Sequence, residues 1–431
     1  MAKIKVINTS ASTFEEDFKK VLLRREKVSA EVEKSVKDIL QVVKEKGDKA
    51  LFNYTEKFDH VRLDSISVVV SSKEIEKAYD DLTKEDVDSL HLAAVRIEQF
   101  HQRQMSQLPM GEREGEGVTQ VVRPLKRIGL YVPGGKASYP SSVLMSAIPA
   151  RVAGVEEIIM VSPSTTCQVL AAAKVSGVSC IYRIGGAQAI AALAYGTESI
   201  PKVDKIVGAG NIYVETAKRL IFGEVGVDMV AGPSEVLIIA DESAVPSFAA
   251  ADLLAQAEHD EDACPMMITP SENFLQEVER EIYFQLKSLV RRKIVERSLE
   301  RKGIMIIASD INEATELANR IAPEHLELMV DDPNEVLSKI TCAGAAFLGN
   351  YSPVTAGDYI AGPSHILPTG GTARFFSPLG VEDFVKRMSV IFFSEEELME
   401  LGDVVIRLAL LEGLDAHAKA VEKRINMSMK T

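Results

Sequence analysis

At 431 residues the chain is too long for a single hydrophobic core, so two or three domains are expected. Its formal net charge of −14 argues against general nucleic-acid binding, because phosphate contacts need clustered lysine and arginine. No uncharged apolar stretch approaches the length of a membrane span, and the first residues lack the apolar run of a secretory signal. The four cysteines are widely spaced, so we expect reduced thiols in a cytoplasmic protein.

Residues 1–110 are predicted to form a mainly helical, highly charged segment. Ser29 is a plausible N-cap for a helix that runs to Lys46 and ends at Gly47. A second long helix is predicted over residues 84–104. Residues 66–70 are rich in β-branched side chains, which favours a short strand between the two helices. Residues 105–119 contain three glycines and charges of alternating sign, and they are predicted to form an exposed loop.

From residue 127 onwards, short apolar strands alternate with amphipathic helices. The first series predicts strands at 127–132, 157–161, 180–184 and 205–208, and helices at 143–153, 167–175 and 187–195. The second series predicts strands at 236–239, 266–269, 304–307, 325–330 and 345–348. This alternation implies parallel sheets covered by helices on both faces. The chain is therefore α/β, and two series of similar size suggest two related domains, at 120–235 and 236–380.

The last residues, 381–431, become helical and charged again. They are predicted to form a tail that packs on something else, such as a neighbouring subunit, since exchange of an element between protomers is a low-cost route to a dimer.

Two glycine-rich turns fall short of nucleotide-binding motifs. Residues 208–213 supply two glycines of the dinucleotide fingerprint, but Tyr213 stands where the third glycine should be. Residues 129–136 are one residue too long for a phosphate-binding loop, and Ala137 replaces its hydroxyl residue. A simple turn explains either pattern equally well. What remains is that several such turns meet helix N-termini, where backbone N–H groups favour anions.

Four polar segments carry most of the residues suited to chemistry. Gln256 and His259 are three apart in a helical pattern, so both project from one face. Glu324 and His325 are adjacent, and at a turn after Pro323 both could face one cavity. The other two segments contain Asp358 with His365, and Glu412 with His417. Each residue by itself has a structural explanation, because a lone histidine usually satisfies its neighbours and a lone aspartate usually caps a helix.

Gathered together, Gln256, His259, Asp358 and His417 would offer a metal two imidazoles, one carboxylate and one amide oxygen. That donor set suits Zn²⁺, with Mn²⁺ or Co²⁺ as alternatives. Ser234 lies just before a predicted strand without a G-x-S-x-G elbow, so we interpret it as a hydrogen-bonding residue rather than a nucleophile.

Nine motifs, taken in order, resemble those of the histidinol dehydrogenase family over essentially the whole chain. They are residues 129–135, 185–189, 208–211, 231–235, 256–259, 322–326, 356–359, 365–369 and 412–417. The resemblance implies oxidation of L-histidinol to L-histidine, the last step of histidine biosynthesis, with two NAD⁺ and a tightly held histidinaldehyde. It also implies a homodimer with two incomplete Rossmann-like domains and an exchanged C-terminal tail.

The resemblance assigns roles to individual residues. It makes Gln256, His259, Asp358 and His417 the ligands of one Zn²⁺, which would also contact the substrate. It assigns Ser234, His365 and Glu412 to the substrate, and Tyr131, Gln188 and Asn211 to NAD⁺. His325 titrates near neutrality and is expected to accept protons, and Glu324 is expected to activate the water that hydrates the aldehyde. A zinc hydrolase that uses Glu324 is the alternative enzyme, and a non-catalytic metal-binding or assembly protein is the third.

Overall fold

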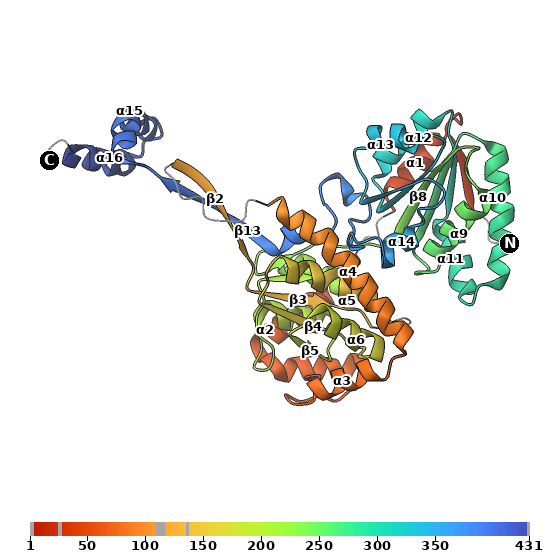
Figure 1. Ribbon diagram of the computed structural model, residues 1–431, viewed down its shortest axis with the longest axis horizontal. Coiled ribbons are helices and arrows are strands. Elements are labelled where there is room, and N and C mark those ends of the chain that lie inside the picture. The colour runs from red at the N-terminus through yellow and green to blue at the C-terminus, as the bar shows by residue number, and fades with distance from the viewer. Residues whose placement is uncertain (1–3, 25–27, 109–116, 135–137, 429–431) are drawn as a thin grey trace. The chain divides into compact units, whose positions relative to one another are not determined.

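The computed structural model describes residues 4–24, 28–108, 117–134 and 138–428. The chain divides into two compact units (Figure 1). The core unit is formed by residues up to 105 and by 125–384, and the tail unit by 106–124 and 385–431. Both β-sheets of the predicted α/β fold lie in the core unit, which confirms the fold class. The predicted boundaries at 110, 235 and 380 stay predictions.

The N-terminal part of the core unit is mainly helical. Its helices are α1 (Phe14–Leu22), α2 (Ala30–Asp59), α3 (Ser72–Asp80) and α4 (Lys84–Ser106). Ser29 caps α2 by accepting a hydrogen bond from Val32 N, and Gly47, with φ of 51°, interrupts that helix as predicted. The strand predicted at 66–70 is wrong, because only Val69 makes an isolated bridge. The Asp64 carboxylate accepts the N–H groups of residues 66 and 67, and this local turn replaces sheet pairing.

The first sheet is parallel and has the order β5-β4-β3-β6-β7. Its strands are β3 (Arg127–Tyr131), β4 (Glu157–Val161), β5 (Cys180–Tyr182), β6 (Lys205–Val207) and β7 (Gly226–Val227). Its helices are α5 (Pro140–Val152), α6 (Cys167–Ser176), α7 (Gly186–Tyr195) and α8 (Ile212–Ile221). In chain order this is the arrangement of a dinucleotide-binding half, with the direction of winding reversing between β3 and β6.

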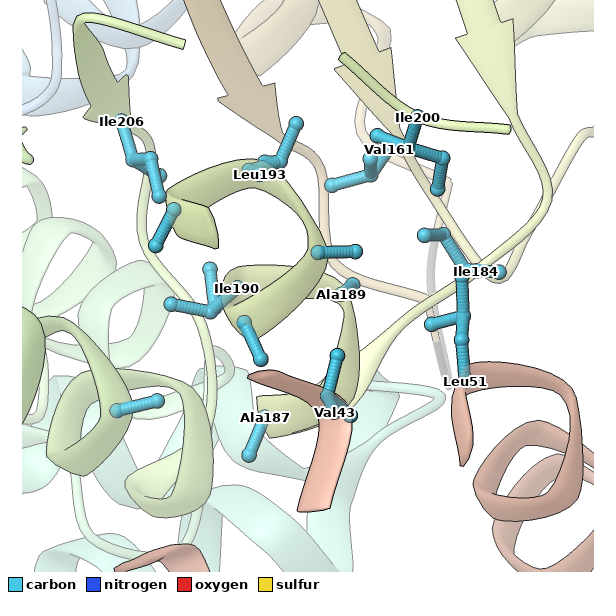
Figure 2. Close-up of a cluster of buried hydrophobic side chains, with 14 of the residues drawn as sticks. Val43, Leu51, Val161, Ile184, Ala187, Ala189, Ile190, Leu193, Ile200 and Ile206 are labelled. Carbon is cyan, nitrogen blue, oxygen red and sulfur yellow. The ribbon is translucent and has the colours of Figure 1, made fainter. Parts of the chain in front are cut away.

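Helix α7 forms the centre of the core beside this sheet. Ile190 and Leu193 are fully buried among side chains from α2 and β6, including Val43 and Ile206 (Figure 2). A Cβ atom on Gly129 of β3 would lie 2.8 Å from Leu193 Cδ1, so the close approach of helix and strand requires glycine there.

The second sheet is also parallel, with the order β1-β10-β9-β8-β11-β12. Its strands are β1 (Lys5–Asn8), β8 (Glu235–Ala240), β9 (Cys264–Thr269), β10 (Ile304–Ile307), β11 (His325–Met329) and β12 (Ala345–Leu348). Its helices are α9 (Pro246–Ala257), α10 (Glu272–Gln285), α11 (Arg292–Lys302), α12 (Ile311–Ile321), α13 (Pro333–Lys339) and α14 (Val354–Tyr359).

Strand β1 was not predicted, and it gives the second sheet an edge strand from the start of the chain. Of its four residues only Ile7 is buried, so the strand is too short and too exposed to produce an apolar pattern. Strands β8 and β9, in contrast, are buried at every position and are nearly continuous apolar runs. Such runs are the sequence signature of the interior of a parallel sheet.

The tail unit pairs β2 (Gly117–Pro124) with β13 (Val385–Phe392) in an antiparallel ribbon, followed by α15 (Glu395–Leu411) and α16 (Asp415–Ser428). A purely helical tail is therefore wrong, because its first eight residues after 384 form a strand. The loop predicted at 105–119 is wrong at both described ends, which belong to α4 and β2, and residues 109–116 lie outside the described part. In the described ranges, no helix is both long and apolar enough for a membrane crossing.

Candidate active site

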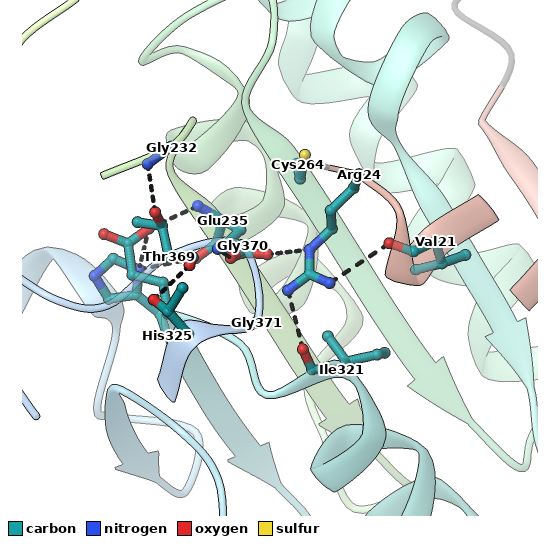
Figure 3. Close-up of polar contacts among 12 residues, drawn as sticks. Val21, Arg24, Gly232, Glu235, Cys264, Ile321, His325, Thr369, Gly370 and Gly371 are labelled. Atoms are coloured by element: carbon teal, nitrogen blue, oxygen red, sulfur yellow. Dashed lines mark hydrogen bonds and ion pairs between the residues drawn. The ribbon is translucent and has the colours of Figure 1, made fainter. Parts of the chain in front are cut away.

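The backbone N–H and carbonyl groups of one residue, Glu235, hold both predicted catalytic side chains. Strands β8 and β11 are neighbours in register, which places Glu235 beside Glu324 and His325. The N–H of Glu235 donates to Glu324 Oε2 at 2.8 Å. The carbonyl oxygen of Glu235 lies 2.9 Å from His325 Nδ1 (Figure 3). Glu324 and His325 are 6% and 5% exposed. The two side chains therefore converge, with 3.6 Å between His325 Nδ1 and Glu324 Oε2.

The side chain of Glu235 fixes the position of this residue through contacts of its own. Its carboxylate pairs with the Arg24 guanidinium and accepts the Gly370 N–H (Figure 3). Arg24 also donates to the carbonyl oxygens of Val21 and Ile321, at the C-terminal ends of α1 and α12. A cation is favourable at such helix ends. Glu235 was not predicted to be a site residue, although an acidic residue at the start of a fully buried strand is unusual.

The hydrogen bond to Glu235 fixes the state of the His325 ring. A carbonyl oxygen can only accept, so Nδ1 carries the hydrogen and Nε2 keeps its lone pair. The expectation that His325 titrates near neutrality is wrong: burial lowers its pKa to about 4, and the nearby charges of His259 and His365 act in the same direction, so the ring is neutral at pH 7. Its Nε2 makes no hydrogen bond to any described residue, and Asp358 Oδ1 lies 3.9 Å away. A neutral ring with a free lone pair can accept a proton.

The pKa of Glu324 is shifted upward, whereas that of His325 is shifted downward. Burial raises its pKa well above the ordinary carboxyl value, the Glu235 N–H opposes this, and the charges of Glu235 and Asp358 add to the rise. A carboxyl group with a raised pKa beside an imidazole with a lowered pKa can exchange protons with a substrate.

A pocket of about 380 Å³ lies in front of His325, and Asp358 and His365 also line it. The ring of His365 lies between two partners, with Nδ1 3.0 Å from Asp358 O and Nε2 3.2 Å from Ser142 Oγ of α5. Phe347 of β12 contributes an aromatic wall, with its ring centroid 6.0 Å from that of His325. Burial raises the pKa of Asp358 to about 6, so its charge is costly without a cation nearby.

The core unit supplies three of the four predicted zinc donors. Gln256, in the last turn of α9, is 2% exposed, and its Nε2 makes no hydrogen bond within the described residues. His259 follows two residues after α9 and is exposed. Asp358 lies on α14, which contacts α9. An amide oxygen, an imidazole and a carboxylate suit Zn²⁺, whereas the unpartnered Nε2 of Gln256 is a hydrogen-bond donor and would contact a ligand acceptor rather than the metal.

The predicted set is not complete within the core unit. His417 lies on α16 and Glu412 directly after α15, both exposed and both in the tail unit. Among the residues that the structure describes, no three or more His, Cys, Asp or Glu side chains gather as a metal site. The three core-unit residues Gln256, His259 and Asp358 carry donor types that zinc takes, and the fourth predicted donor, His417, belongs to the tail unit.

The predicted cofactor residues lie at the carboxyl edge of the first sheet, where the winding reverses. Tyr131 is 4% exposed, and its hydroxyl accepts the Gly186 N–H at 3.1 Å. Asn211 caps α8 by accepting the N–H groups of residues 213 and 214. Gly210 approaches the Tyr131 ring so closely that a Cβ atom on it would lie 3.0 Å from Cε1. Gln188, 1% exposed, lies in the first turn of α7 against Gly186.

The pocket around His325 lies at the amino edge of its sheet, unlike the predicted cofactor residues, which lie at a carboxyl edge. His325 and Glu235 are the first residues of β11 and β8, so the pocket is at the amino edge of the second sheet. Open α/β sheets usually bind ligands at the carboxyl edge. There, the Asp241 carboxylate accepts the N–H groups of Ser243 and Asp331, which ties the strand ends together. Ser234, half-buried, directly precedes Glu235, and its carbonyl accepts the Cys264 N–H.

A buried charge cluster beside the predicted cofactor residues was not predicted from the sequence. Lys218 of α8 is 0% exposed, pairs with Asp228 at 2.7 Å and donates to Gly208 O at 2.8 Å. Glu215, one turn earlier, is 4% exposed and lies 3.6 Å from Lys218. The spacing was visible in the sequence, but an i,i+3 charge pair usually lies on an exposed helix face.

The Glu215 carboxyl makes stability depend on pH. Burial raises its pKa to about 7, Lys218 opposes this, and Asp228 adds to it. The folded protein therefore holds the proton more tightly than the unfolded chain, and this stabilisation is present below about pH 4.5 and is lost as the pH rises through 7. In the unsubstituted protein this group should lower the free energy of unfolding by on the order of 3 kcal/mol as the pH rises from 4.5 to 7. We expect Glu215→Gln to abolish that decrease. Denaturant unfolding at several pH values measures it, and parallel curves for both proteins would contradict it.

A sheet in dinucleotide-binding order and a pocket lined by a neutral imidazole favour an α/β oxidoreductase. The histidinol dehydrogenase family model matches residues 22–425. A histidinol dehydrogenase of Geobacter metallireducens is 51% identical over 428 residues, which cover 98% of each chain. One of Aquifex aeolicus is 52% identical over 403 residues, 94% of this chain and 95% of that one. The crystal structure of the Elizabethkingia anophelis histidinol dehydrogenase superposes with a TM-score of 0.92, 36% identity and 99% coverage of both chains. The chain belongs to the histidinol dehydrogenase family.

Proposed function

We propose that the protein oxidises L-histidinol to L-histidine in two steps with two NAD⁺, in the cytoplasm, as the last step of histidine biosynthesis. Family membership supports the substrate. The observation that carries the chemistry is the pair of hydrogen bonds by which Glu235 holds Glu324 beside the neutral ring of His325, which lines the pocket.

The residues divide into three groups in this proposal. Zn²⁺ would be held by Gln256, His259, Asp358 and His417. The substrate would contact these ligands together with Ser234, His325, His365 and Glu412. NAD⁺ would contact Tyr131, Gln188 and Asn211. When bound, the zinc ion supplies coordination positions for substrate nitrogen atoms, which orients the alcohol carbon.

His325 handles the protons of both oxidations. As the alcohol carbon gives its hydride to the first NAD⁺, Nε2 accepts the hydroxyl proton, and an aldehyde results. Glu324 then takes a proton from water as the water oxygen adds to the aldehyde carbon, and it returns a proton to the new alkoxide oxygen, so that the gem-diol forms. The second hydride leaves to a second NAD⁺ while Nε2 accepts another proton, and the product is the carboxylic acid. Proton release from His325 between the steps is favoured by its lowered pKa.

Counting NADH tests this function and its metal. Histidinol at limiting concentration should give two equivalents of NADH, none after zinc is removed by a chelator, and two again when zinc is restored. The reason is that the metal orients the substrate and does not only stabilise the fold. Absorbance at the NADH wavelength measures the count, and far-ultraviolet circular dichroism of the chelated sample checks that it stays folded. One equivalent, or turnover unaffected by the chelator, would contradict the proposal, and amide or ester hydrolysis without NADH would favour the hydrolase.

The tail unit supports a homodimer. The ribbon and α15 expose many apolar side chains, which are Val118, Met388, Ile391, Phe392, Val404, Val405, Leu408, Leu410 and Leu411. Exposed apolar patches of this kind mark protein interfaces. A second copy of the chain is the proposed partner, because the missing zinc ligand His417 lies on the same unit.

We expect sedimentation of the zinc-loaded protein to give twice the 47.1 kDa mass of one chain. Leu408→Asp should shift this toward single chains, since it would bury a charge in the interface. Val290→Asp is the matched control, because Val290 is 99% exposed on the core unit. A single-chain mass for the unsubstituted protein at micromolar concentration would argue against the dimer.

A further inference from the structure

Glu215 connects two loops that the proposed function assigns to different ligands. Its Oε1 accepts the N–H of Gly210 at 2.9 Å, directly before the cofactor residue Asn211. Its Oε2 accepts the N–H of Ala231 at 2.7 Å, three residues before the substrate residue Ser234. The side chain of Glu215 is buried, so water does not compete for either bond.

The same cluster also fixes the start of the cofactor loop. The Gly208 N–H donates to Asp228 Oδ2 at 2.8 Å, and its carbonyl accepts from Lys218. Gly208 has φ of 106°, and a Cβ atom on it would lie 2.2 Å from Tyr131 O, so the loop lies tightly against the end of β3. Because Asp228 and Ala231 belong to one connection, both of its ends are attached to the cofactor loop.

That connection leads directly into the catalytic anchor. Ser234 follows Ala231 by three residues, and Glu235, which holds Glu324 and His325, follows by four. A displacement of the cofactor loop is therefore passed toward the residues beside the substrate, and of the two carboxylates that join this loop to the connection, Glu215 makes the contact nearer to Ser234. A glutamine could accept only one of the two N–H groups, because its amide nitrogen is a donor.

We infer that Glu215 is a positioning residue that couples the binding of the nicotinamide cofactor to the binding of the substrate. This inference rests on the proposed function for the identity of the two ligands. Coupling of this kind is reciprocal, so each ligand raises the affinity of the protein for the other by the same factor. Each ligand orders its own loop, and Glu215 passes that order to the second loop.

The test compares Glu215→Gln with Glu224→Gln in the full-length, zinc-loaded protein at pH 8, where Glu215 is ionised. Glu224 is an exposed residue that pairs with Lys44. Calorimetric titration with NADH, which cannot accept hydride, is carried out with and without L-histidinol. We expect a coupling factor of about fivefold or more in the unsubstituted protein and the control, and a factor near one in Glu215→Gln.

Hydrogen–deuterium exchange gives a second readout that does not depend on activity. In Glu215→Gln the Gly210 and Ala231 amides should together exchange about tenfold faster, and Glu224→Gln should leave them unchanged. If Glu215→Gln does not fold, Glu215→Asp replaces it, because the shorter carboxylate keeps the charge but cannot span both loops. An unchanged coupling factor in the folded variant, or no coupling in the unsubstituted protein, overturns the inference.

The outcome is separate from that of the proposed function. If the unsubstituted protein forms NADH from histidinol and the variant keeps full coupling, only the role of Glu215 is wrong. If no NADH forms, the proposed function fails, and amide exchange still reports whether Glu215 ties the two loops together.

Discussion

Replacing His325 by asparagine is expected to lower the rate of both oxidations by about 10²–10⁴-fold, the usual contribution of a general base. Asparagine can still donate from its side-chain amide to Glu235 O, so the anchor that Nδ1 makes at 2.9 Å is retained. It has no nitrogen lone pair to replace Nε2, which faces the pocket without a hydrogen bond to a described residue. The loss should therefore fall on the rate of hydride transfer rather than on substrate binding.

Single-turnover NADH formation, with histidinol and separately with histidinaldehyde, measures the two rates. His60→Asn is the matched control, because His60 is exposed and adopts φ of 57°, a left-handed conformation that asparagine also tolerates. The melting temperature of the His325 variant should stay close to that of the control. A loss of less than tenfold in a folded protein would mean that another group accepts the proton.

Replacing Glu324 by glutamine is expected to act mainly on the second oxidation. The glutamine carbonyl can still accept the Glu235 N–H that Glu324 Oε2 accepts at 2.8 Å, so the local structure should persist. It cannot take a proton from water, and hydration of the aldehyde should slow by about 10²–10⁴-fold. The alcohol step, which needs only His325 as a base, should keep most of its rate.

Separate initial rates for histidinol and histidinaldehyde measure this division of labour. Glu335→Gln provides the control, since Glu335 is exposed and pairs only with Lys339 in the part of the chain that the structure describes. Equal losses on the two substrates would show that Glu324 supports the fold of the pocket or both hydride steps, and would remove its assignment as the base for water.

The regular part of the fold was predictable because parallel strands carry a strong signal. Strands such as β8 and β9 are buried at every position, and their apolar runs gave nearly correct limits. Strands β1 and β13 were missed because most of their residues are exposed and their partners are distant in the chain. Residues 66–70 have the composition of a strand, but the nearby Asp64 carboxylate stabilises a turn instead.

The site was predictable only in part. Polar clusters and the family motifs predicted Glu324 and His325 as site residues. The amino-acid sequence alone cannot show that the backbone of a single residue holds both. The role of Glu235 depends on the register of β8 and β11, which is a property of the assembled sheet. The same holds for the lowered pKa of His325, because its main cause is burial. Where Gln256, His259, Asp358 and His417 meet remains a proposal.

The central claim is that His325 and Glu324, held side by side by Glu235, perform different parts of a two-step oxidation. The most direct test is the number of NADH molecules that the Glu324→Gln protein forms per active site when histidinol and NAD⁺ are mixed in a single turnover. The account predicts one equivalent at close to the normal rate, followed by a pause with the aldehyde retained. Two equivalents at a uniformly lower rate, or none, would contradict it.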